Sequence, residues 1–437
     1  MADTLTQPDA PPSMLIIDTG HLALVGGVLT ELALGFQEPA AVPGALPGAG
    51  TSGIDRLGLT RWELRDSDDR PLAELDGVLL EVRRRIAARH GGWLPALGKA
   101  RQVGSTVIAG GNPKPTAASL NPRPVPVGDD AVGQPLAGPA SPAAMLGGHP
   151  KPTVAGAAAA FAPLGGHPKP TGVGSPEPFD FVDLDDAAAA DTSTPTVRIG
   201  LIDTPLSDLA TPAEVWTAHS AFVRHVVLAA APAAEIVPRY VLDGPHGTGD
   251  LWDVANAMVE LANDEQVDIL LLPLACFTAD GQAPLLLERA VQRISPTTLI
   301  IAAAGNQTLQ AGWSVLDRGR SSPAWPAAID RVRALGTVFD TDQPGEPAPQ
   351  EPTQPWVDAL TVESAFSGPF FTGSVALDDG TSESFDGLAR WRGTSFCAAH
   401  AAGLVAARMS TGSTAQQAWD ALLAEATDLR APAVGGA

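Results

Sequence analysis

Short apolar runs alternate with amphipathic stretches through the second half of the chain. The apolar runs have strand length and lie at residues 197–203, 236–242, 267–272 and 298–304. Residues 250–263 and 283–294, between the later runs, have the apolar spacing of helices. Strands that are apolar along their whole length are typical of parallel sheets covered on both faces. The pattern therefore predicts an α/β domain at residues 191–427, with helices on both faces of a parallel sheet.

A smaller pattern precedes it at residues 13–100. Residues 14–18 and 61–65 read as strands. Residues 73–90 have helical periodicity and stop before Gly91-Gly92. We expect a small folded module here. No catalytic constellation is apparent in it, so its role stays open.

Between the two patterns, residues 101–190 read as a linker rich in proline, glycine and alanine, and they contain a repeat. Gly-Gly-Asn-Pro-Lys-Pro-Thr at 110–116 recurs as Gly-Gly-His-Pro-Lys-Pro-Thr at 147–153 and 165–171. The prolines favour extended polyproline geometry, which presents one lysine per copy. Two interpretations stay open: a docking peptide for a protein partner or a processing site, and a low-complexity spacer expanded by duplication.

The amino-acid composition indicates that part of the chain does not pack into a folded core. Its 437 residues include 45 glycines and 41 prolines, far above the usual share. We expect a disordered N-terminus at residues 1–12 and a flexible tail at residues 428–437. The two cysteines, Cys276 and Cys397, need no disulfide framework.

The net charge of −22 argues against nucleic acid and anionic membrane surfaces as partners. The apolar stretch at 14–36 is interrupted by Asp18, His21 and Glu31, which disfavours a membrane span. The N-terminus has no basic region followed by an apolar run and a cleavage site. We expect a soluble chain kept in the cytoplasm, with export by another route left open.

Reactive side chains stand at the ends of predicted elements. Asp203 ends the first strand of the α/β domain and Asn306 follows the fourth, so both belong at the edge where ligands bind. Ser395 follows the Gly393-Thr394 turn and opens an alanine-rich helix, whose N–H groups favour a nearby anion. His219 begins an apolar helical run. Hydroxyl, imidazole, carboxylate and amide are the groups that acyl transfer needs, although Ser395 taken alone also fits an ordinary helix cap.

Three segments resemble subtilisin-like serine peptidases. They are Leu-Ile-Asp-Thr at 201–204, Ile-Ala-Ala-Ala-Gly-Asn at 301–306 and Gly-Thr-Ser-Phe-Cys-Ala-Ala-His at 393–400. The order Asp, His, Asn, Ser is also that of the family. The resemblance implies a subtilisin-like fold and a serine endopeptidase acting on a protein or peptide substrate. Its triad would be Asp203, His219 and Ser395, with Asn306 as oxyanion donor.

Two histidines compete for the role of base. His246 is followed by Gly-Thr, as in the family, but it lies between a predicted strand and a helix, where a surface loop is expected. His219 has the expected place, on a helix after Asp203, although Ser220 and Ala221 stand where the family has Gly-Thr. We therefore assign the base to His219.

The segment Leu-Leu-Pro-Leu-Ala at 271–275 stands where the family has a strand that pairs with extended substrate. The resemblance makes Leu272, Pro273, Leu274 and Ala275 substrate-binding, although Pro273 removes one backbone donor. No cofactor is implied, and no Asp/Glu spacing specifies a calcium loop. His400 and Cys397, beyond Ser395 on its own helix, are interpreted as packing residues.

Two functions follow from these residues. The first is an active serine endopeptidase, which could also cut its own linker. The second is a binding or scaffold protein with the same fold and docking repeats, motivated by the altered surroundings of His219 and by Pro273. In either case residues 13–100 and the repeats would restrain the domain or tether it to an assembly.

Overall fold

The computed structural model describes residues 14–38, 56–72, 75–99, 102–103, 169–170, 173–178, 196–244, 247, 249–276, 278, 282–305, 323–338, 350–351, 361–363, 365–376, 382–409 and 412–430. Asn306 and His246 lie outside these residues, as do the first two copies of the repeat and most of the acidic stretch at 340–354.

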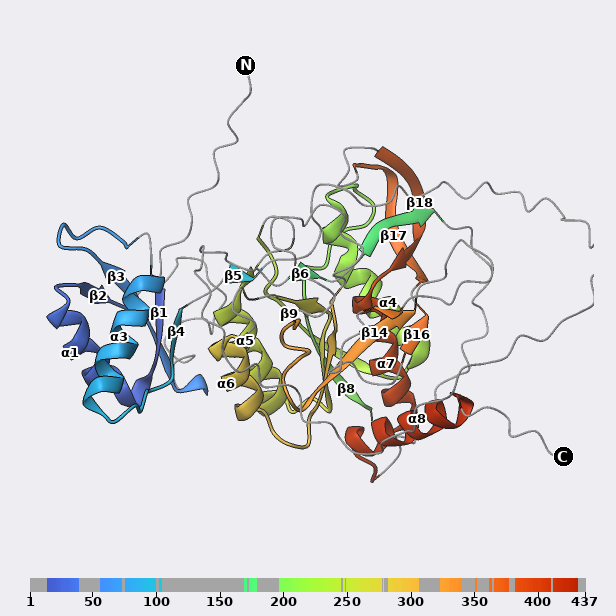
Figure 1. Ribbon diagram of the computed structural model, residues 1–437. Helices are drawn as coiled ribbons and strands as arrows, with labels where there is room; N and C mark the ends of the chain where they lie inside the picture. Colours follow the sequence, from blue (N-terminus) through green and yellow to red (C-terminus); the bar gives the residue numbers. More distant parts are fainter. Residues whose placement is uncertain are drawn as a thin grey trace, which may run out of the picture.

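The α/β half of the chain is built on a seven-stranded sheet (Figure 1). Its central part has the order β9-β8-β11-β13-β14, and all these strands run parallel. Their bounds are β8 Arg198–Asp203, β9 Glu235–Tyr240, β11 Ile269–Leu272, β13 Leu299–Ala303 and β14 Val332–Val338. Two short strands, β15 (Gln350–Glu351, antiparallel) and β16 (Thr361–Glu363, parallel), pair with β14. The predicted parallel sheet is confirmed, and each expected strand agrees to within two residues at either end.

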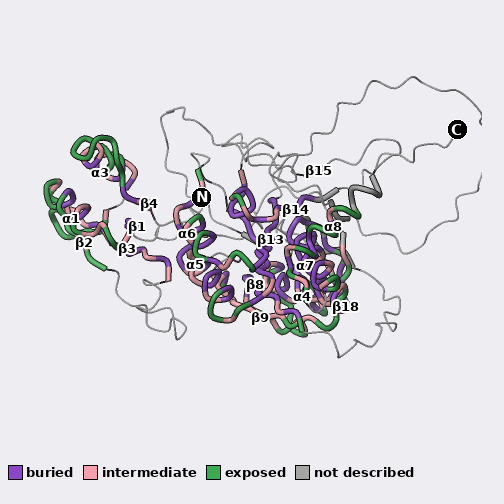
Figure 2. Tube along the Cα trace, turned by 90° about the horizontal axis from the view of Figure 1, so that it is seen from below, coloured by how far each residue is buried: buried purple, intermediate pink, exposed green. Residues whose placement is uncertain are grey.

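Helices cover both faces of this sheet. One face carries α4 (His219–Ala230), which follows the short helix η2 (Val215–Ala218), together with α7 (Thr394–Arg408) and α8 (Ala415–Arg430). The other carries α5 (Leu251–Val259), its π-helical extension η4 (Glu260–Asp264) and α6 (Leu285–Arg293). Alternate strand residues divide between the two cores: Ile199 and Leu201 face α4 and α7, and Ile202 faces α5. Figure 2 shows buried residues concentrated along the strands and their flanking helices.

A second sheet leads directly into α7. β17 (Ala365–Ala376) and β18 (Ser382–Arg392) form an antiparallel pair, and β7 (Val173–Pro178) adds to the outer edge of β18. Two further short pairs join β12 (Leu274–Ala275) to β6 (Lys169–Pro170), and β10 (Gly249–Asp250) to β5 (Gln102–Val103). Three segments of the predicted linker thus contribute strands to the α/β half.

The N-terminal module has a four-stranded antiparallel sheet in the order β2-β3-β1-β4. Its strands are β1 Met14–Asp18, β2 Gly35–Gln37, β3 Leu59–Arg65 and β4 Leu97–Lys99. The short helix η1 (Thr19–His21) follows β1, and α1 (Leu22–Glu31) and α3 (Asp76–Arg89) contribute to a core on one face of this sheet. The helix predicted at 73–90 begins at Asp76 in the structure, three residues after its predicted start, and Leu75 is its N-cap residue.

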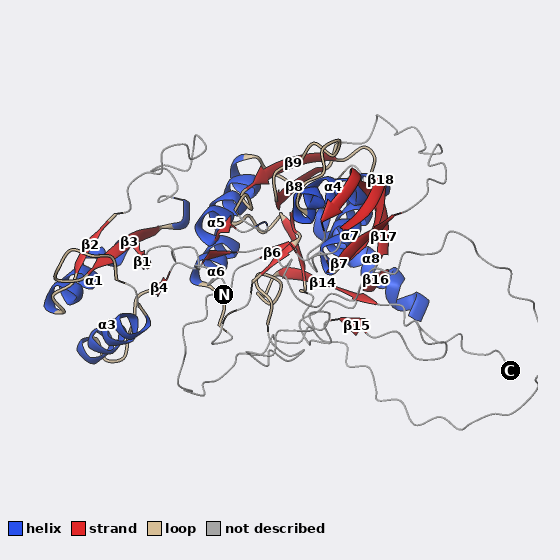
Figure 3. Ribbon diagram, turned by 90° about the horizontal axis from the view of Figure 1, so that it is seen from above, coloured by secondary structure: helices blue, strands red, loops and turns tan. Residues whose placement is uncertain are grey.

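The other face of the module sheet packs on α5 and α6 (Figure 3). Ile16, Leu57 and Leu59 belong to the same buried cluster as Trp252 of α5. The Arg61 guanidinium lies 4.6 Å above the Trp252 ring and 3.0 Å from the Asp250 carboxylate. Shared apolar burial makes the module and the α/β domain parts of one folded body.

Ion pairs reinforce this contact. Arg289 Nη2 of α6 lies 2.9 Å from Asp18 Oδ2, and Arg56 pairs with Glu260 and Asp264. Burial disfavours ionised Asp18, but the hydrogen bonds from Arg289 and the Gly20 N–H outweigh it, and the pKa of Asp18 is lowered. In the part of the chain that the structure describes, no helix is both long enough and apolar enough to cross a bilayer.

Gly403 lets α7 approach α4 closely. A Cβ at this position would lie 2.7 Å from Val227 O and 2.8 Å from Ala230 Cβ. We expect Gly403→Ala to lower the free energy of unfolding by about 1–3 kcal/mol, because backbone atoms cannot yield as a flexible side chain would. Gly27→Ala is the matched control: Gly27 is helical, and a Cβ there would meet no atom of another element within 4 Å, so the change should be neutral or stabilise by up to about 1 kcal/mol. Urea denaturation of both variants measures this, and equal effects would contradict the packing argument.

Asp253 of α5 should make stability depend on pH. Burial, reinforced by the nearby Asp250 carboxylate, raises the pKa of Asp253 to about 6. The unfolded chain therefore releases this proton at lower pH than the folded protein, and the group's contribution to stability falls as pH rises from about 4 to 6. We expect Asp253→Asn to raise the melting temperature at pH 8 relative to wild type, with a smaller difference at pH 4. A difference that does not change between these pH values would contradict the assignment.

Candidate active site

Asp203 and His219 form a buried pair at the carboxyl edge of the sheet. Asp203 is the last residue of β8, and His219 is the first of α4. His219 Nδ1 lies 2.8 Å from Asp203 Oδ1 and 3.0 Å from Oδ2. The Thr204 N–H donates to Oδ1 at 2.6 Å, so the carboxylate is held from two sides. Both side chains have at most 1% of their surface exposed.

The carboxylate determines which nitrogen of His219 carries the proton. An ionised carboxylate only accepts hydrogen bonds, so Nδ1 must be the donor, and the lone pair of a neutral imidazole then lies on Nε2. Nε2 is buried and has no hydrogen-bond partner among the described residues. The geometry therefore leaves a basic nitrogen in an apolar environment.

Two aromatic side chains hold the imidazole ring. Trp391 meets it edge-on at 5.9 Å between ring centroids, and Phe396 lies at 5.4 Å. Trp391 is in β18, and Phe396 is in the first turn of α7. This packing was not predicted from the sequence, because no periodic pattern connects either residue to His219.

Ser395 lies immediately before Phe396. Gly393 precedes the helix with φ +148°, in the region that favours glycine, and this turn allows β18 to lead directly into α7. Ser395 is fully buried, and its Oγ donates to Pro273 O at 3.0 Å. The predicted position of Ser395 at the start of a helix is confirmed.

The predicted substrate-binding residues lie where β11 ends. Leu272 closes β11, Pro273 interrupts the strand, and Leu274–Ala275 continue it as β12. All four are buried, and β12 pairs with β6 of the same chain. Because β8 and β11 are neighbours, this segment and Asp203 are at the same edge of the sheet.

Other side chains singled out in the sequence have packing contacts. His400 stacks at 5.4 Å on Phe366, and Cys397 and Cys276 are buried. His225, the second histidine of α4, is half-buried, and burial lowers its pKa. No group of three or more His, Cys, Asp and Glu side chains suited to a metal occurs among the described residues.

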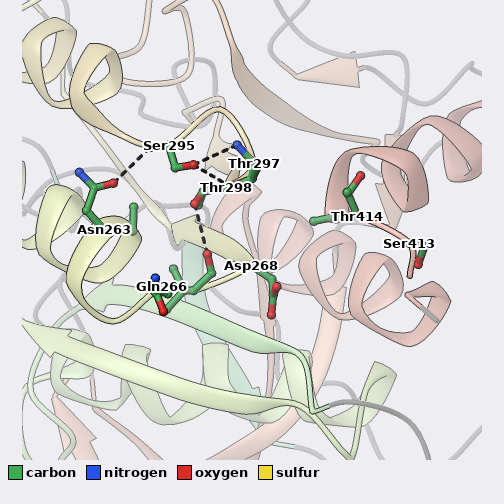
Figure 4. Close-up of a pocket in the computed structure, with 11 residues that line it drawn as sticks. Asn263, Gln266, Asp268, Ser295, Thr297, Thr298, Ser413 and Thr414 are labelled. Carbon is green, nitrogen blue, oxygen red and sulfur yellow. Dashed lines mark hydrogen bonds between the residues drawn. The ribbon is translucent and has the colours of Figure 1, made fainter. Parts of the chain in front are cut away.

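A separate polar pocket of about 320 Å³ opens at the opposite end of the sheet (Figure 4). It lies beside the amino ends of β11 and β13 and the start of α8, and Asp268, Ser295, Thr298 and Thr414 are among its lining residues. None of the candidate site residues lines it.

Comparisons with known proteins add distant structural likenesses. No protein-family model and no curated protein matches the chain. It is similar to a solved structure described as "Crystal Structure of a Lanthipeptide Protease", with 18% identity, TM-score 0.37, and coverage of 51% of this chain and 78% of that one. It is also similar to "S41 Psychrophilic Protease", with 18% identity, TM-score 0.35, and coverage of 52% and 82%. Because both TM-scores are below 0.5, we base the functional proposal on the chain's own residues.

Ser220 offers a test of how apolar the site is. Its Oγ is buried beside His219 without a hydrogen-bond partner among the described residues. Ser220→Ala should raise the free energy of unfolding by about 1 kcal/mol, because it removes an unsatisfied polar group. Thr278→Val is the contrasting control and should lower it by a similar amount, since Thr278 Oγ1 bonds Gln282 O and Trp325 Nε1. Chemical denaturation measures both, and destabilisation by Ser220→Ala would contradict this description of the site.

Proposed function

We propose that this chain is a serine endopeptidase of the subtilisin type. The observation that carries the proposal is the buried Asp203–His219 hydrogen bond, which leaves Nε2 of the imidazole without a partner among the described residues. Phe396, the neighbour of Ser395, packs on that same imidazole. A carboxylate, an oriented imidazole and a serine at a helix N-terminus are the parts of a hydrolytic triad.

In the proposed mechanism, His219 Nε2 takes the proton of Ser395 Oγ as Oγ attacks the peptide carbonyl. Ser395 Oγ donates to Pro273 O in the structure, so this hydrogen bond must break before the hydroxyl can donate to the imidazole. Asp203 stabilises the imidazolium that forms and keeps Nδ1 as the donor. His219 then passes the proton to the leaving amine.

The oxyanion would be bound by the Ser395 backbone N–H and the Asn306 side chain. The start of a 15-residue helix favours negative charge at Ser395. Gly305, the residue before Asn306 in the sequence, follows β13 and has φ +92°, in the region that favours glycine. β13 neighbours β11, so the carboxyl end of β13 belongs to the same edge of the sheet as Asp203. The role of Asn306 is part of the proposal.

A peptide substrate fits this site because β12 is a short strand next to Pro273 that pairs with an extended segment. Pairing of an extended segment with a strand is a recurring way of binding peptides through their backbone, and β12 is paired with β6 in this way. The proposal therefore assigns Leu272, Pro273, Leu274 and Ala275 to substrate binding.

Labelling with a fluorophosphonate probe tests the triad. We expect covalent modification of Ser395 in the native protein and none in Ser395→Ala. Asp203→Asn should keep the fold but lower peptide hydrolysis by about 10⁴-fold, because an asparagine in that place permits the wrong imidazole tautomer. Tandem mass spectrometry of the labelled peptide locates the adduct, and an adduct elsewhere, or equal labelling of Ser395→Ala, would refute the proposal.

Two observations favour the second candidate, a binding or scaffold protein with the same fold. In the structure the chain's own β6 occupies β12, and Ser395 Oγ donates to a carbonyl. A protein of this kind would bind peptides at β12 without labelling at Ser395, so the same experiment separates the two functions.

A further inference from the structure

The polar pocket at the amino ends of β11 and β13 has a lining rich in hydroxyl groups (Figure 4). Of its 11 lining residues only Asp268 is charged, and five are serine or threonine. The lining holds no cation to attract an anion and no aromatic ring on which a flat ligand could stack. Its volume of about 320 Å³ is at the lower end for ligand pockets, so the pocket suits a small polar group.

The hydroxyl groups of this lining use some of their protons within the protein. Thr298 Oγ1 donates to Val267 O at 3.2 Å, and a hydrogen bond of 2.7 Å joins Ser295 Oγ to Thr297 Oγ1. The oxygens keep lone pairs for a ligand, and an ionised Asp268 carboxylate only accepts hydrogen bonds. The pocket therefore favours a ligand that brings several donors and a positive charge.

The arginines bonded beside the pocket do not neutralise it. Arg198 donates its backbone N–H to Asp268 Oδ2 at 2.9 Å, while its guanidinium lies against Glu235 and Glu265. The Arg331 guanidinium donates to three main-chain carbonyls. Neither arginine lines the pocket, and Oδ1 of Asp268 accepts no hydrogen bond from the described residues. The carboxylate can therefore attract a further cation.

A primary ammonium group has the chemistry that this pocket accepts. It carries three donors on one compact charge, whereas a guanidinium is a broad planar fork. Only four of the 27 lysines and arginines of the chain are lysines, and three of the four are in the Pro-Lys-Pro-Thr repeats. The fourth, Lys99, pairs with Asp76 in the N-terminal module.

We propose that the pocket binds the ammonium group of Lys151, in the copy of the repeat at 147–153, against the Asp268 carboxylate. Lys151 precedes Lys169 of β6 by 18 residues, which reach roughly 60 Å when extended. β6 pairs with Leu274, six residues beyond Asp268 along β11 and β12, or about 20 Å. The tether therefore has enough length to pass over the surface from one edge of the sheet to the other.

The tether also explains how one charge contact is enough. A single ion pair that water can reach is weak. A linker of this length gives the lysine an effective concentration on the order of millimolar, and the prolines reduce the entropy lost on docking. Docking holds the linker against the amino end of the sheet, and it does not depend on hydrolysis by Ser395.

Zero-length cross-linking of the full-length protein tests this contact. A carbodiimide joins an ammonium to a carboxylate where the two groups touch, and the use of Ser395→Ala excludes cleavage of the linker by the proposed triad. We expect mass spectrometry to find a link between Lys151 and Asp268. The ion pair of Lys99 with Asp76 is the internal control and should be linked in the same sample.

The pattern of links decides the outcome. A link between Lys99 and Asp76 without one between Lys151 and Asp268 would overturn the proposal. A link to Asp268 from Lys114, which has a shorter tether of 11 residues from β5, would overturn the choice of copy. In a mixture of nitrogen-15-labelled and unlabelled protein, links between the two kinds of chain would overturn docking within one chain.

Peptide binding tests the need for the charge. The probe is an acetylated and amidated peptide copying residues 147–153, added to full-length protein with Ser395→Ala and Lys151→Gln. We expect its affinity to fall at least tenfold when norleucine replaces its lysine, and in Asp268→Asn, which keeps an acceptor for the Arg198 N–H. Asp420→Asn, at an exposed carboxylate of α8 outside the pocket, is the matched control and should change the affinity less than twofold.

Peptide-observed NMR measures these affinities. Equal binding of the lysine and norleucine peptides, or equal binding to Asp268→Asn, would overturn the proposal. These measurements are independent of the fluorophosphonate experiment. Failure of the docking therefore leaves the proposed peptidase standing, and absence of a Ser395 adduct leaves the docking standing.

Discussion

The buried hydrogen bond between Asp203 and His219 is the constraint on which the α/β half depends. A carboxylate withdrawn from water is costly unless it is paired, and removing one partner of such a pair typically costs about 3–5 kcal/mol. The pair forms because β8 ends where α4 begins to cover the sheet, and because Gly403 lets α7 approach α4 closely enough for Phe396 to pack on the imidazole. The same helix places Ser395 one residue before that contact.

Most of the fold, and both residues of the Asp203–His219 pair, could be predicted from the sequence. Continuous apolar runs predicted the parallel strands, and the position of Asp203 after one of them predicted its edge of the sheet. His219 was identified by its place on a helix, not by its neighbours, since Ser220 and Ala221 depart from the family pattern. In the structure His219 begins α4 and contacts Asp203, and the catalytic roles of both residues stay proposals.

Contacts between short segments that are far apart in the chain could not be predicted from the sequence. Trp391 and Phe396 surround His219 through tertiary packing, and aromatic residues in a strand and a helix carry no signal of that meeting. β6 and β7 lie in a stretch whose proline and glycine content indicates a linker. β6, with two residues, is also too short to show any periodicity. The contact of the module with α5 and α6 likewise joins segments far apart in the sequence, since Arg61 contacts Trp252 and Asp250.

The tautomer of His219 shows whether Asp203 orients the imidazole. Nitrogen-15 NMR of histidine-labelled protein, with His219→Gln to assign the signals, distinguishes a protonated Nδ1 from a protonated Nε2. We expect the neutral form of the imidazole to carry its proton on Nδ1 and its lone pair on Nε2, and we expect this preference to be lost in Asp203→Asn. A proton on Nε2 in the wild-type protein would contradict it.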